Sequence, residues 1–315
     1  MRAGVIEIGT NSIKFCLAEK KMDRIQILLD KDIVTRLGER QSETGKMSEV
    51  AMQRTFIAIK DCLNTAHKFK VDRIVGVGTM ALRVAINAQE FLQKVYSECG
   101  LSVKIISREK EAKLSYKGAV SSLPIENTNY LVVDIGGGST EFIWGTANKI
   151  ESIVSLNLGV VYLTEKFLIS NPPTGSELHN ASQEIQHLLI KNRITRKKSD
   201  QLIGVGGTIT TMIAIKYGMK EYIPEKIHGA KLDIKDAKAQ IGIFKSKTVE
   251  ERKKIAGLPP GRADVILAGA LIVYAVLQDL QFNSLIGSDR GLRHAVLFDI
   301  LNENFSNKNH RGKEQ

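Results

Sequence analysis

Short apolar runs alternate with longer stretches of helical periodicity along most of the 315-residue chain. Continuous or alternating apolar residues predict strands, and apolar residues three and four positions apart predict helices. The predicted strands are residues 3–8, 13–18, 24–34, 73–77, 103–107, 130–133, 142–144, 149–157, 203–205 and 285–287. The predicted helices are residues 50–69, 88–99, 109–119, 159–167, 176–190, 236–244, 248–255, 265–277 and 291–301, and residues 36–45 are predicted to form a loop.

The strand pattern at the start of the chain recurs in its second half. Three consecutive predicted strands open the chain, and three more follow residue 129. Strands that alternate with helices indicate an α/β protein, here built twice. The tract 121–129 contains Pro124 and several Asn and Thr residues, which favours a boundary there. We therefore expect one domain over residues 1–125 and a second over residues 126–288.

A strand that ends in an acid and glycine occurs twice. The apolar residues 130–133 lead into Asp134–Glu141, which contains three glycines, and Glu7–Ser12 repeats the order of acid, apolar residue, glycine and small polar residues. Glycine lacks a Cβ atom, so its backbone N–H groups can close around phosphate oxygens. An ordinary hairpin turn with polar residues is the alternative. Because the device is repeated, we expect two similar halves that face each other across a phosphate site.

Two further glycine turns follow predicted strands, at residues 78–79 and 206–210, and each is a candidate anion cradle. Residues 76–81 also match the dinucleotide-binding fingerprint with alanine in the last position. That motif requires an acid after the next strand, but Ser107 and Arg108 stand there. Phosphate binding without a nicotinamide cofactor is therefore the favoured interpretation.

The fractions of hydrophobic and charged residues are ordinary for a globular protein, but the chain has an excess of basic residues. Hydrophobic residues make up 43% and charged residues 25%, whereas the net charge is +11 with a pI near 9.4. A basic protein favours acidic partners. With 6% aromatic residues and one Trp, the chain lacks the aromatic and basic interleaving that stacks single-stranded bases. The basic runs Lys191–Lys198 and Lys245–Lys254 are either solvated faces or surfaces that steer polyanions.

The cysteines and histidines form no recognisable metal motif. Cys16, Cys62 and Cys99 are widely spaced, which argues against a disulfide framework or a zinc site and is typical of the reducing cytoplasm. The six His are scattered, which argues against a histidine-built metal site. The longest apolar run, residues 265–277, is shorter than the ~20 residues that span a bilayer. No signal peptide is visible, and we expect a cytoplasmic protein without a membrane partner.

Eight motifs together resemble the exopolyphosphatase/guanosine pentaphosphate phosphohydrolase (Ppx/GppA) family of the actin-like ATPase superfamily. The motifs are Glu7–Ser12, Arg36–Glu39, Gly78–Arg83 with Asn87, Ile106–Ala112, Asp134–Glu141, Gly204–Thr208, Arg262–Ile266 and Ser288–Arg293. The resemblance covers nearly the whole chain. It implies two actin-like (ribonuclease H-like) domains with an interdomain active-site cleft, and a last helix, residues 289–305, that packs back on the first domain.

The resemblance also implies roles for individual residues. Glu111 corresponds to the catalytic glutamate that activates water, although the run 109–111 alone would suggest only a surface charge. Glu141 corresponds to a second catalytic carboxylate, and Glu7, Asp134 and Glu141 are expected to hold Mg²⁺, with K⁺ or Mn²⁺ as further candidate ions beside it. The expected phosphate-binding residues are Asn11, Ser12, Arg83, Gly137, Gly138, Ser139, Thr140, Gly206, Gly207 and Thr208.

The function implied is hydrolysis of the terminal phosphate of inorganic polyphosphate by a homodimer. The alternatives are hydrolysis of the 5′ phosphate of guanosine pentaphosphate, with a role in the stringent response, and a weakly active sensor that binds polyphosphate, guanosine pentaphosphate or guanosine tetraphosphate. A kinase is disfavoured because its base is usually a differently placed aspartate. The chain departs from the family pattern at Glu7, where Asp is usual, and at His294, where an acid is common. We also expect a short form of the family, without the appended C-terminal domain of longer members.

Overall fold

The computed structural model describes residues 1–302 except 23, 122 and 124–127. The chain forms two compact units, Met1–Leu114 with Leu292–Gln315, and Ser115–Gly291. The boundary predicted at residue 125 lies outside the described residues, as does the end of the predicted helix 289–305. Helix α5 (Arg108–Val120) runs through the observed boundary between Leu114 and Ser115.

The first unit contains a five-stranded mixed sheet in the order β3-β2-β1-β4-β5. Its strands are β1 (Arg2–Ile8), β2 (Ser12–Lys21), β3 (Arg24–Val34), β4 (Arg73–Gly78) and β5 (Val103–Ile105). Strands β1, β2 and β3 form an antiparallel meander, whereas β4 and β5 continue the sheet parallel to β1. The sheet is therefore a hairpin meander extended by parallel crossover strands.

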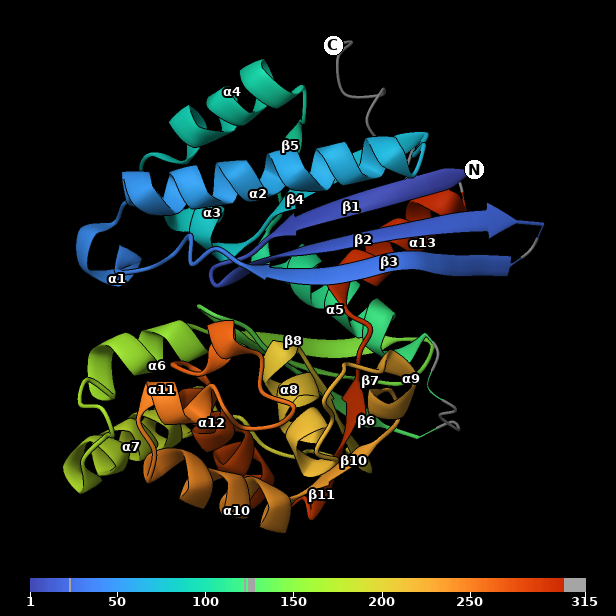
Figure 1. The fold of residues 1–315 in the computed structure, drawn as a ribbon. Helices are drawn as coiled ribbons and strands as arrows, with labels where there is room; N and C mark the ends of the chain where they lie inside the picture. The colour runs from blue at the N-terminus through green and yellow to red at the C-terminus, as the bar shows by residue number, and fades with distance from the viewer. Residues whose placement is uncertain (23, 122, 124–127, 303–315) are drawn as a thin grey trace, which may run out of the picture. The chain divides into compact units, whose positions relative to one another are not determined.

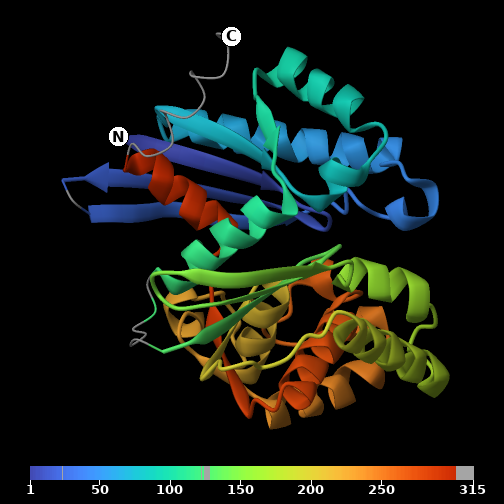
Figure 2. The same ribbon diagram turned by 180° about the vertical axis from the view of Figure 1, so that it is seen from behind.

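Helices cover both faces of this sheet (Figures 1 and 2). The helices of the unit are α1 (Gln41–Thr44), α2 (Glu49–Lys68), α3 (Met80–Val84), α4 (Ala88–Cys99) and α13 (Leu292–Leu301). Ile6 and Phe15 face α2, α3 and α4, while their neighbours Val5 and Cys16 face α13. This alternation is the period of two that a strand buried on both faces requires. Glu7 therefore lies on the face of the sheet that α13 covers.

The second unit repeats the plan in a six-stranded sheet with the order β10-β11-β9-β6-β7-β8. Its strands are β6 (Tyr130–Ile135), β7 (Thr140–Gly145), β8 (Ile150–Leu156), β9 (Gln201–Val205), β10 (Lys231–Asp233) and β11 (Ser284–Ser288). Strands β6, β7 and β8 form the meander, β9 and β11 run parallel to β6, and β10 is an added antiparallel edge. The same strand order in both units is the ribonuclease H-like topology, which confirms the predicted α/β fold class.

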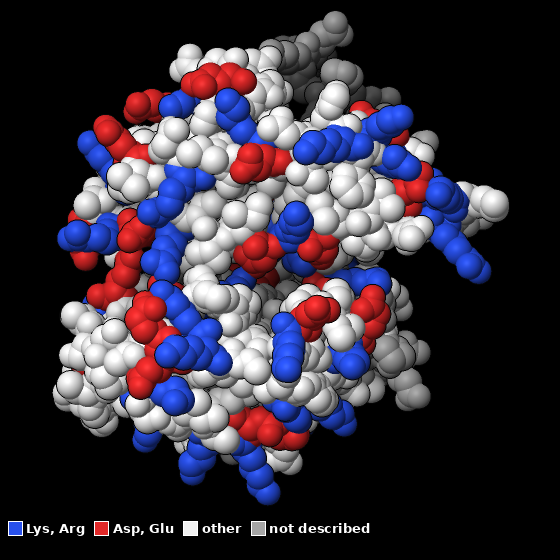
Figure 3. Space-filling model, in the orientation of Figure 1, with Lys and Arg blue, Asp and Glu red and all other residues white. Residues whose placement is uncertain are grey.

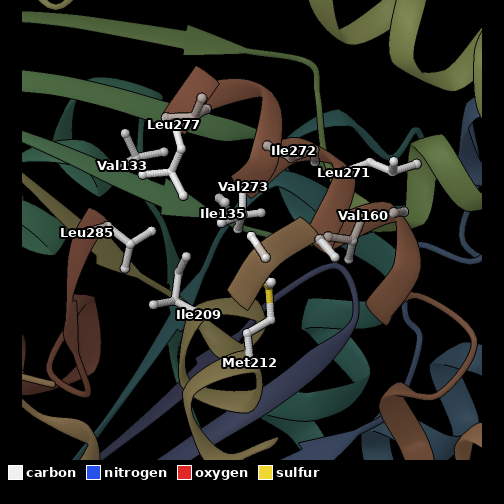
Figure 4. Close-up of a cluster of buried hydrophobic side chains, with 14 of the residues drawn as sticks. Val133, Ile135, Val160, Ile209, Met212, Leu271, Ile272, Val273, Leu277 and Leu285 are labelled. Atoms are coloured by element: carbon white, nitrogen blue, oxygen red, sulfur yellow. The ribbon is translucent and has the colours of Figure 1, made fainter. Parts of the chain in front are cut away.

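The main core of the second unit lies between its sheet and its helices. These helices are α6 (Val160–Phe167), α7 (Gly175–Lys191), α8 (Gly207–Lys216), α9 (Pro224–Ile227), α10 (Ile234–Lys245), α11 (Val249–Arg252) and α12 (Ile266–Asp279), with a 3₁₀ turn at Pro260–Arg262. Figure 4 shows Val133 and Ile135 of β6 pointing toward Ile209 and Met212 of α8 and toward α12. Each such side chain stabilises the fold by roughly 1.5–3 kcal/mol when fully buried. This packing fixes the ends of β6 and β9, where two of the glycine turns begin.

Several predicted elements differ from the structure. The predicted loop 36–45 contains the short helix α1, and the predicted helix 248–255 is helical only over Val249–Arg252, because a turn follows. Helices α8 and α9 and strand β10 were not predicted. Helix α8 is rich in Thr and Ile, which favour strands, and its burial on several sides stabilises the helix against that preference.

Candidate active site

The first phosphate turn joins β1 to β2 and begins at Glu7. Glu7 is 6% exposed, and its cross-strand partner is Lys14. The Lys14 ammonium donates to Glu7 Oε1 at 3.1 Å, while Oε2 is buried and accepts no hydrogen bond within the described chain. The carboxylate that was expected to bind metal is therefore already paired with a cation through one of its oxygens.

Asn11 lies at the tip of this turn, with Ser12 beside it, and both are buried. The Asn11 carbonyl accepts from the backbone N–H groups of Thr35 and Arg36, which fixes the turn against the loop after β3. Among the described residues, neither polar atom of the Asn11 side-chain amide has a hydrogen-bond partner. Because a buried amide without a partner costs about 1–3 kcal/mol, a polar ligand would stabilise it.

Arg83 and Glu111 form an ion pair in the same unit. Arg83 Nη1 donates to Glu111 Oε2 at 2.9 Å and to the Ile106 carbonyl at 2.8 Å. The two side chains are 17% and 13% exposed, so Glu111 is not the surface charge that its sequence neighbours suggest. Arg83 Nε and Nη2 are buried and make no hydrogen bond in the described part of the chain. Two guanidinium donors beside a carboxylate are suited to a phosphate group.

The second phosphate turn joins β6 to β7 and carries two acids. Asp134 is the penultimate residue of β6, and Glu141, 2% exposed, is its cross-strand partner on β7. Directly paired residues share one face of a sheet, with Cβ atoms about 4.5–5.5 Å apart. Ser155 Oγ donates to Glu141 Oε1 at 2.8 Å and so orients this carboxylate.

Ser115 is a site residue that the sequence analysis missed. Its hydroxyl, on α5, donates to Asp134 Oδ2. On the other side of the carboxylate lies Gly206, with a positive φ of 100°. A Cβ atom there would lie 2.6 Å from the Ile135 carbonyl oxygen and 3.1 Å from Asp134 Oδ1. Asp134 is thus held by a hydroxyl on one side and adjoins a backbone position that only glycine can occupy.

The glycines of the second turn pack closely against the start of α6. Gly136 donates to the Ser139 carbonyl at 2.9 Å, which closes the turn. A Cβ atom on Gly159 would lie 2.1 Å from the Gly137 carbonyl oxygen, so no side chain fits between these segments. The Thr140 hydroxyl donates to the carbonyl of Leu158 and so holds the same junction. Gly137, Gly138 and Ser139 lie together in this turn, while the hydroxyl of Thr140 is used within the protein.

The glycine turn at residues 206–210 leads into α8. A Cβ atom on Gly207 would lie 2.0 Å from Nη2 of Arg262, so the guanidinium rests on the first turn of the helix. Thr208 is 3% exposed and packs against Gly269 of α12, where a Cβ atom would lie 2.4 Å from the Thr208 methyl group. Arg262 is a further residue of the site that the sequence analysis quoted as a motif but gave no role.

The two hairpins differ in the charge of the residue that stands opposite the first acid. In the first turn Glu7 stands opposite Lys14, whereas in the second Asp134 stands opposite Glu141. Two carboxylates on one face are the hard oxygen ligands that Mg²⁺ prefers. The residues of the second turn therefore fit a divalent cation, while Glu7 has only its Oε2 atom outside the ion pair.

The basic residues do not form a single patch on the face of the molecule shown in Figure 3. On the face shown in Figure 3, Lys and Arg are interspersed with Asp and Glu. Within the run Lys191–Lys198, Lys197 lies 3.9 Å from the centre of the Trp144 ring, and Arg196 lies 4.4 Å from that of Phe282. These two cations therefore also stabilise the unit itself. No described helix combines the length and the apolar character needed to cross a bilayer.

Taken together, the two ribonuclease H-like sheets and the glycine turns beside their carboxylates are typical of a protein that binds phosphate groups. The family model for the Ppx/GppA phosphatase family matches residues 16–304. The chain therefore belongs to the Ppx/GppA phosphatase family. This confirms the predicted family and the predicted enzyme class, a hydrolase of phosphoric anhydride bonds.

The chain is similar to two curated proteins over nearly its full length. A bifunctional 3-dehydroquinate synthase/phosphatase of Fusobacterium nucleatum is 33% identical over 315 residues, which cover 95% of this chain but 46% of that protein. The chain thus spans about half the length of that relative. Exopolyphosphatase 2 of Mycobacterium tuberculosis is 29% identical over 310 residues, which cover 95% of this chain and 97% of that protein.

Solved structures agree with this family. A Ppx/GppA family member from Aquifex aeolicus has a TM-score of 0.80 and 37% identity, covering 97% of this chain and 99% of that one. An exopolyphosphatase from Cytophaga hutchinsonii has a TM-score of 0.89 and 27% identity, covering 96% and 98%.

Proposed function

We propose that this protein removes the terminal phosphate from inorganic polyphosphate. The observation that carries the proposal is the buried Arg83–Glu111 pair with its two guanidinium donors outside any hydrogen bond of the described chain. Membership of a phosphatase family and similarity to two exopolyphosphatases support the choice of substrate. The donors would bind the terminal phosphate, and the adjoining carboxylate would receive a proton from water.

In the proposed reaction, a water oxygen bonds to the terminal phosphorus while the bridging P–O bond breaks. Glu111 takes a proton from the water, and the shortened chain leaves as an anion. Phosphoryl transfer depends mainly on positioning and charge neutralisation, and a base of this kind contributes about 10²–10⁴-fold. Arg83 orients Glu111 through the 2.9 Å contact, so the base and the phosphate-binding group are positioned together.

Asp134 and Glu141 would hold Mg²⁺ through their carboxylate oxygens. The ion, when bound, would neutralise charge on the phosphate oxygens. Ser115 and Ser155 would keep the two carboxylates in place through their hydroxyl groups. We therefore expect activity to require Mg²⁺ and to be lost on chelation.

Two alternatives use the same residues. Guanosine pentaphosphate would present its 5′ terminal phosphate to the same base, and this activity would place the protein in the stringent response. A sensor with little turnover is favoured by one observation, the neutralisation of Glu7 by Lys14 where the family usually has Asp. Replacing Glu with Asp shortens the side chain by about one bond, and shifts of an ångström can change rates about 100-fold.

The test is phosphate release from short polyphosphate, long polyphosphate and guanosine pentaphosphate, with Mg²⁺ and with chelator, by the wild type and Glu7→Asp. Fastest release from polyphosphate supports the proposal, and fastest release from the nucleotide supports the first alternative. Binding without release by the wild type, with release gained in Glu7→Asp, would identify an attenuated sensor. We also propose a cytoplasmic homodimer, which light scattering of the purified protein and fractionation of cells would test.

A further inference from the structure

Three metal-ligating side chains meet on the face of the first sheet that α13 covers. Cys16 lies on β2, Asp30 on β3 and His294 on α13. One ligand atom from each lies within 4.8 Å of the others, and theirs is the one such group of three found in the described chain. Cys16 is 0% and His294 2% exposed, while the Asp30 side chain is 17% exposed. The cluster is therefore buried, and it is open to solvent only through Asp30.

We propose that Cys16, Asp30 and His294 form a Zn²⁺-binding site. A thiolate, an imidazole and a carboxylate are the ligands that zinc takes in proteins, whereas Mg²⁺ prefers oxygen ligands. Three protein ligands leave the fourth tetrahedral position for a water molecule. None of these residues belongs to the candidate active site, so the site would bind its ion independently of the proposed reaction.

The spacing of the ligand atoms fits one tetrahedral ion. Cys16 and Asp30 are direct cross-strand partners in the β2–β3 ladder, so their side chains share this face. His294 Nε2 lies 3.1 Å from Asp30 Oδ2. Two ligands bound at about 2.0–2.1 Å in a tetrahedral geometry lie about 3.3 Å apart. The ion would therefore need only a small separation of these two side chains.

Arg293 holds the Asp30 carboxylate of the site through both of its oxygens. Its Nε donates to Asp30 Oδ1 at 2.8 Å and its Nη2 donates to Oδ2 at 2.7 Å. Residues that surround a metal site commonly orient its ligands through hydrogen bonds of this kind. Burial alone would raise the pKa of Asp30, but Arg293 and His294 outweigh it and lower the pKa to about 2. The carboxylate is thus ionised. The Oδ2 lone pair that faces His294 is the one that the ion would take, so Arg293 can keep both contacts.

The charges and protons balance when zinc binds. Cys16 loses its thiol proton to solvent, and the thiolate and the Asp30 carboxylate together neutralise the ion. In the zinc-bound site, His294 would carry its proton on Nδ1 and place its Nε2 lone pair on the metal. The bound ion would connect β2, β3 and α13, and so would attach the last helix of the chain to the sheet of the first unit.

Cobalt(II) titration of the full-length protein tests the site, because a bound thiolate gives Co²⁺ an intense near-ultraviolet charge-transfer band. We expect one equivalent of Co²⁺ to produce the band, which Zn²⁺ then displaces. Cys16→Ser should abolish the band, whereas Cys62→Ser and Cys99→Ser, which change the two other thiols, should keep it. His294→Gln should weaken binding at least tenfold.

A second readout keeps the proposal testable if one variant folds poorly. Zn²⁺ alone should raise the melting temperature of the wild type and of Cys62→Ser, but not of His294→Gln, with circular dichroism confirming each fold. The absence of a band in the wild type, or a band that persists in Cys16→Ser, would overturn the proposal.

Discussion

The Arg83→Lys substitution should weaken phosphate binding while leaving the stability of the fold nearly unchanged. The wild-type guanidinium has Nη1 engaged with Glu111 and the Ile106 carbonyl, while Nε and Nη2 are buried without hydrogen bonds to described residues. Lysine can keep the ion pair with Glu111, but it cannot also present two further donors in a fixed plane. The substitution therefore removes the donors assigned to the substrate while it preserves the charge.

The size of the effect follows from the lost contacts. A hydrogen bond to a charged group contributes about 1.5–3 kcal/mol, and 1.4 kcal/mol corresponds to tenfold. Loss of one such bond to the phosphate should lower kcat/KM about 10- to 100-fold. Because two buried donors without partners are also removed, the free energy of unfolding without ligand should stay within about 1 kcal/mol of the wild type.

Two measurements are made on Arg83→Lys and on the control Arg40→Lys. The first is kcat/KM for polyphosphate, and the second is the free energy of unfolding in urea. Arg40 is a suitable control because it is 75% exposed and pairs with Glu43 at the surface. We expect Arg40→Lys to match the wild type in both measurements. A kcat/KM within twofold of the wild type for Arg83→Lys would refute the phosphate-binding role, and a loss of stability above about 3 kcal/mol would make the role of Arg83 structural.

Three other predictions follow from the same structure. Glu111→Gln should lower kcat about 10²–10⁴-fold, whereas Glu109→Gln, at a position 68% exposed on the same helix, should not; equal losses would argue against a base at 111. Ser115→Ala should raise the Mg²⁺ concentration for half-maximal activity about 10- to 100-fold, and Ser115→Thr should restore it; an unchanged Mg²⁺ dependence would exclude support of Asp134. The backbone N–H groups of Thr174 and Ser170, which precede α7, lower the pKa of Glu177 from 4.5 to about 2, so the stabilisation is present above pH 4.5 and lost as the pH falls toward 2. The amide protection factors of α7, corrected for the intrinsic pH dependence of exchange, should therefore fall over that range in the wild type but not in Glu177→Gln, and identical profiles would contradict this.

Elements with a clear apolar period could be predicted from the sequence. Strand β3 was predicted with the bounds Arg24–Val34 that the structure has, because its alternation is regular. Helix α2 was predicted within a residue at each end, since Ser48 caps it through the N–H of Ala51. Strand β10 has three residues and pairs only with β11, so its existence depends on a tertiary contact that no local pattern contains.

The site could be predicted in part. The pairing of Glu7 with Lys14 follows from the register of the β1–β2 hairpin, so it could have been predicted from the sequence. The bond from Ser115 to Asp134 depends on how α5 packs on β6, so it could not be predicted. The cluster around His294 was missed for the same reason, because its ligands share no sequence motif and meet only when α13 covers the sheet.

The central claim is that water attacks the terminal phosphorus of polyphosphate. The most direct measurement is hydrolysis of polyphosphate in ¹⁸O-labelled water with Mg²⁺, followed by mass spectrometry of the orthophosphate and of the shortened chain. The account predicts orthophosphate release with one labelled oxygen in each released phosphate and none in the chain. Label in the chain, or no release although polyphosphate binds, would contradict it.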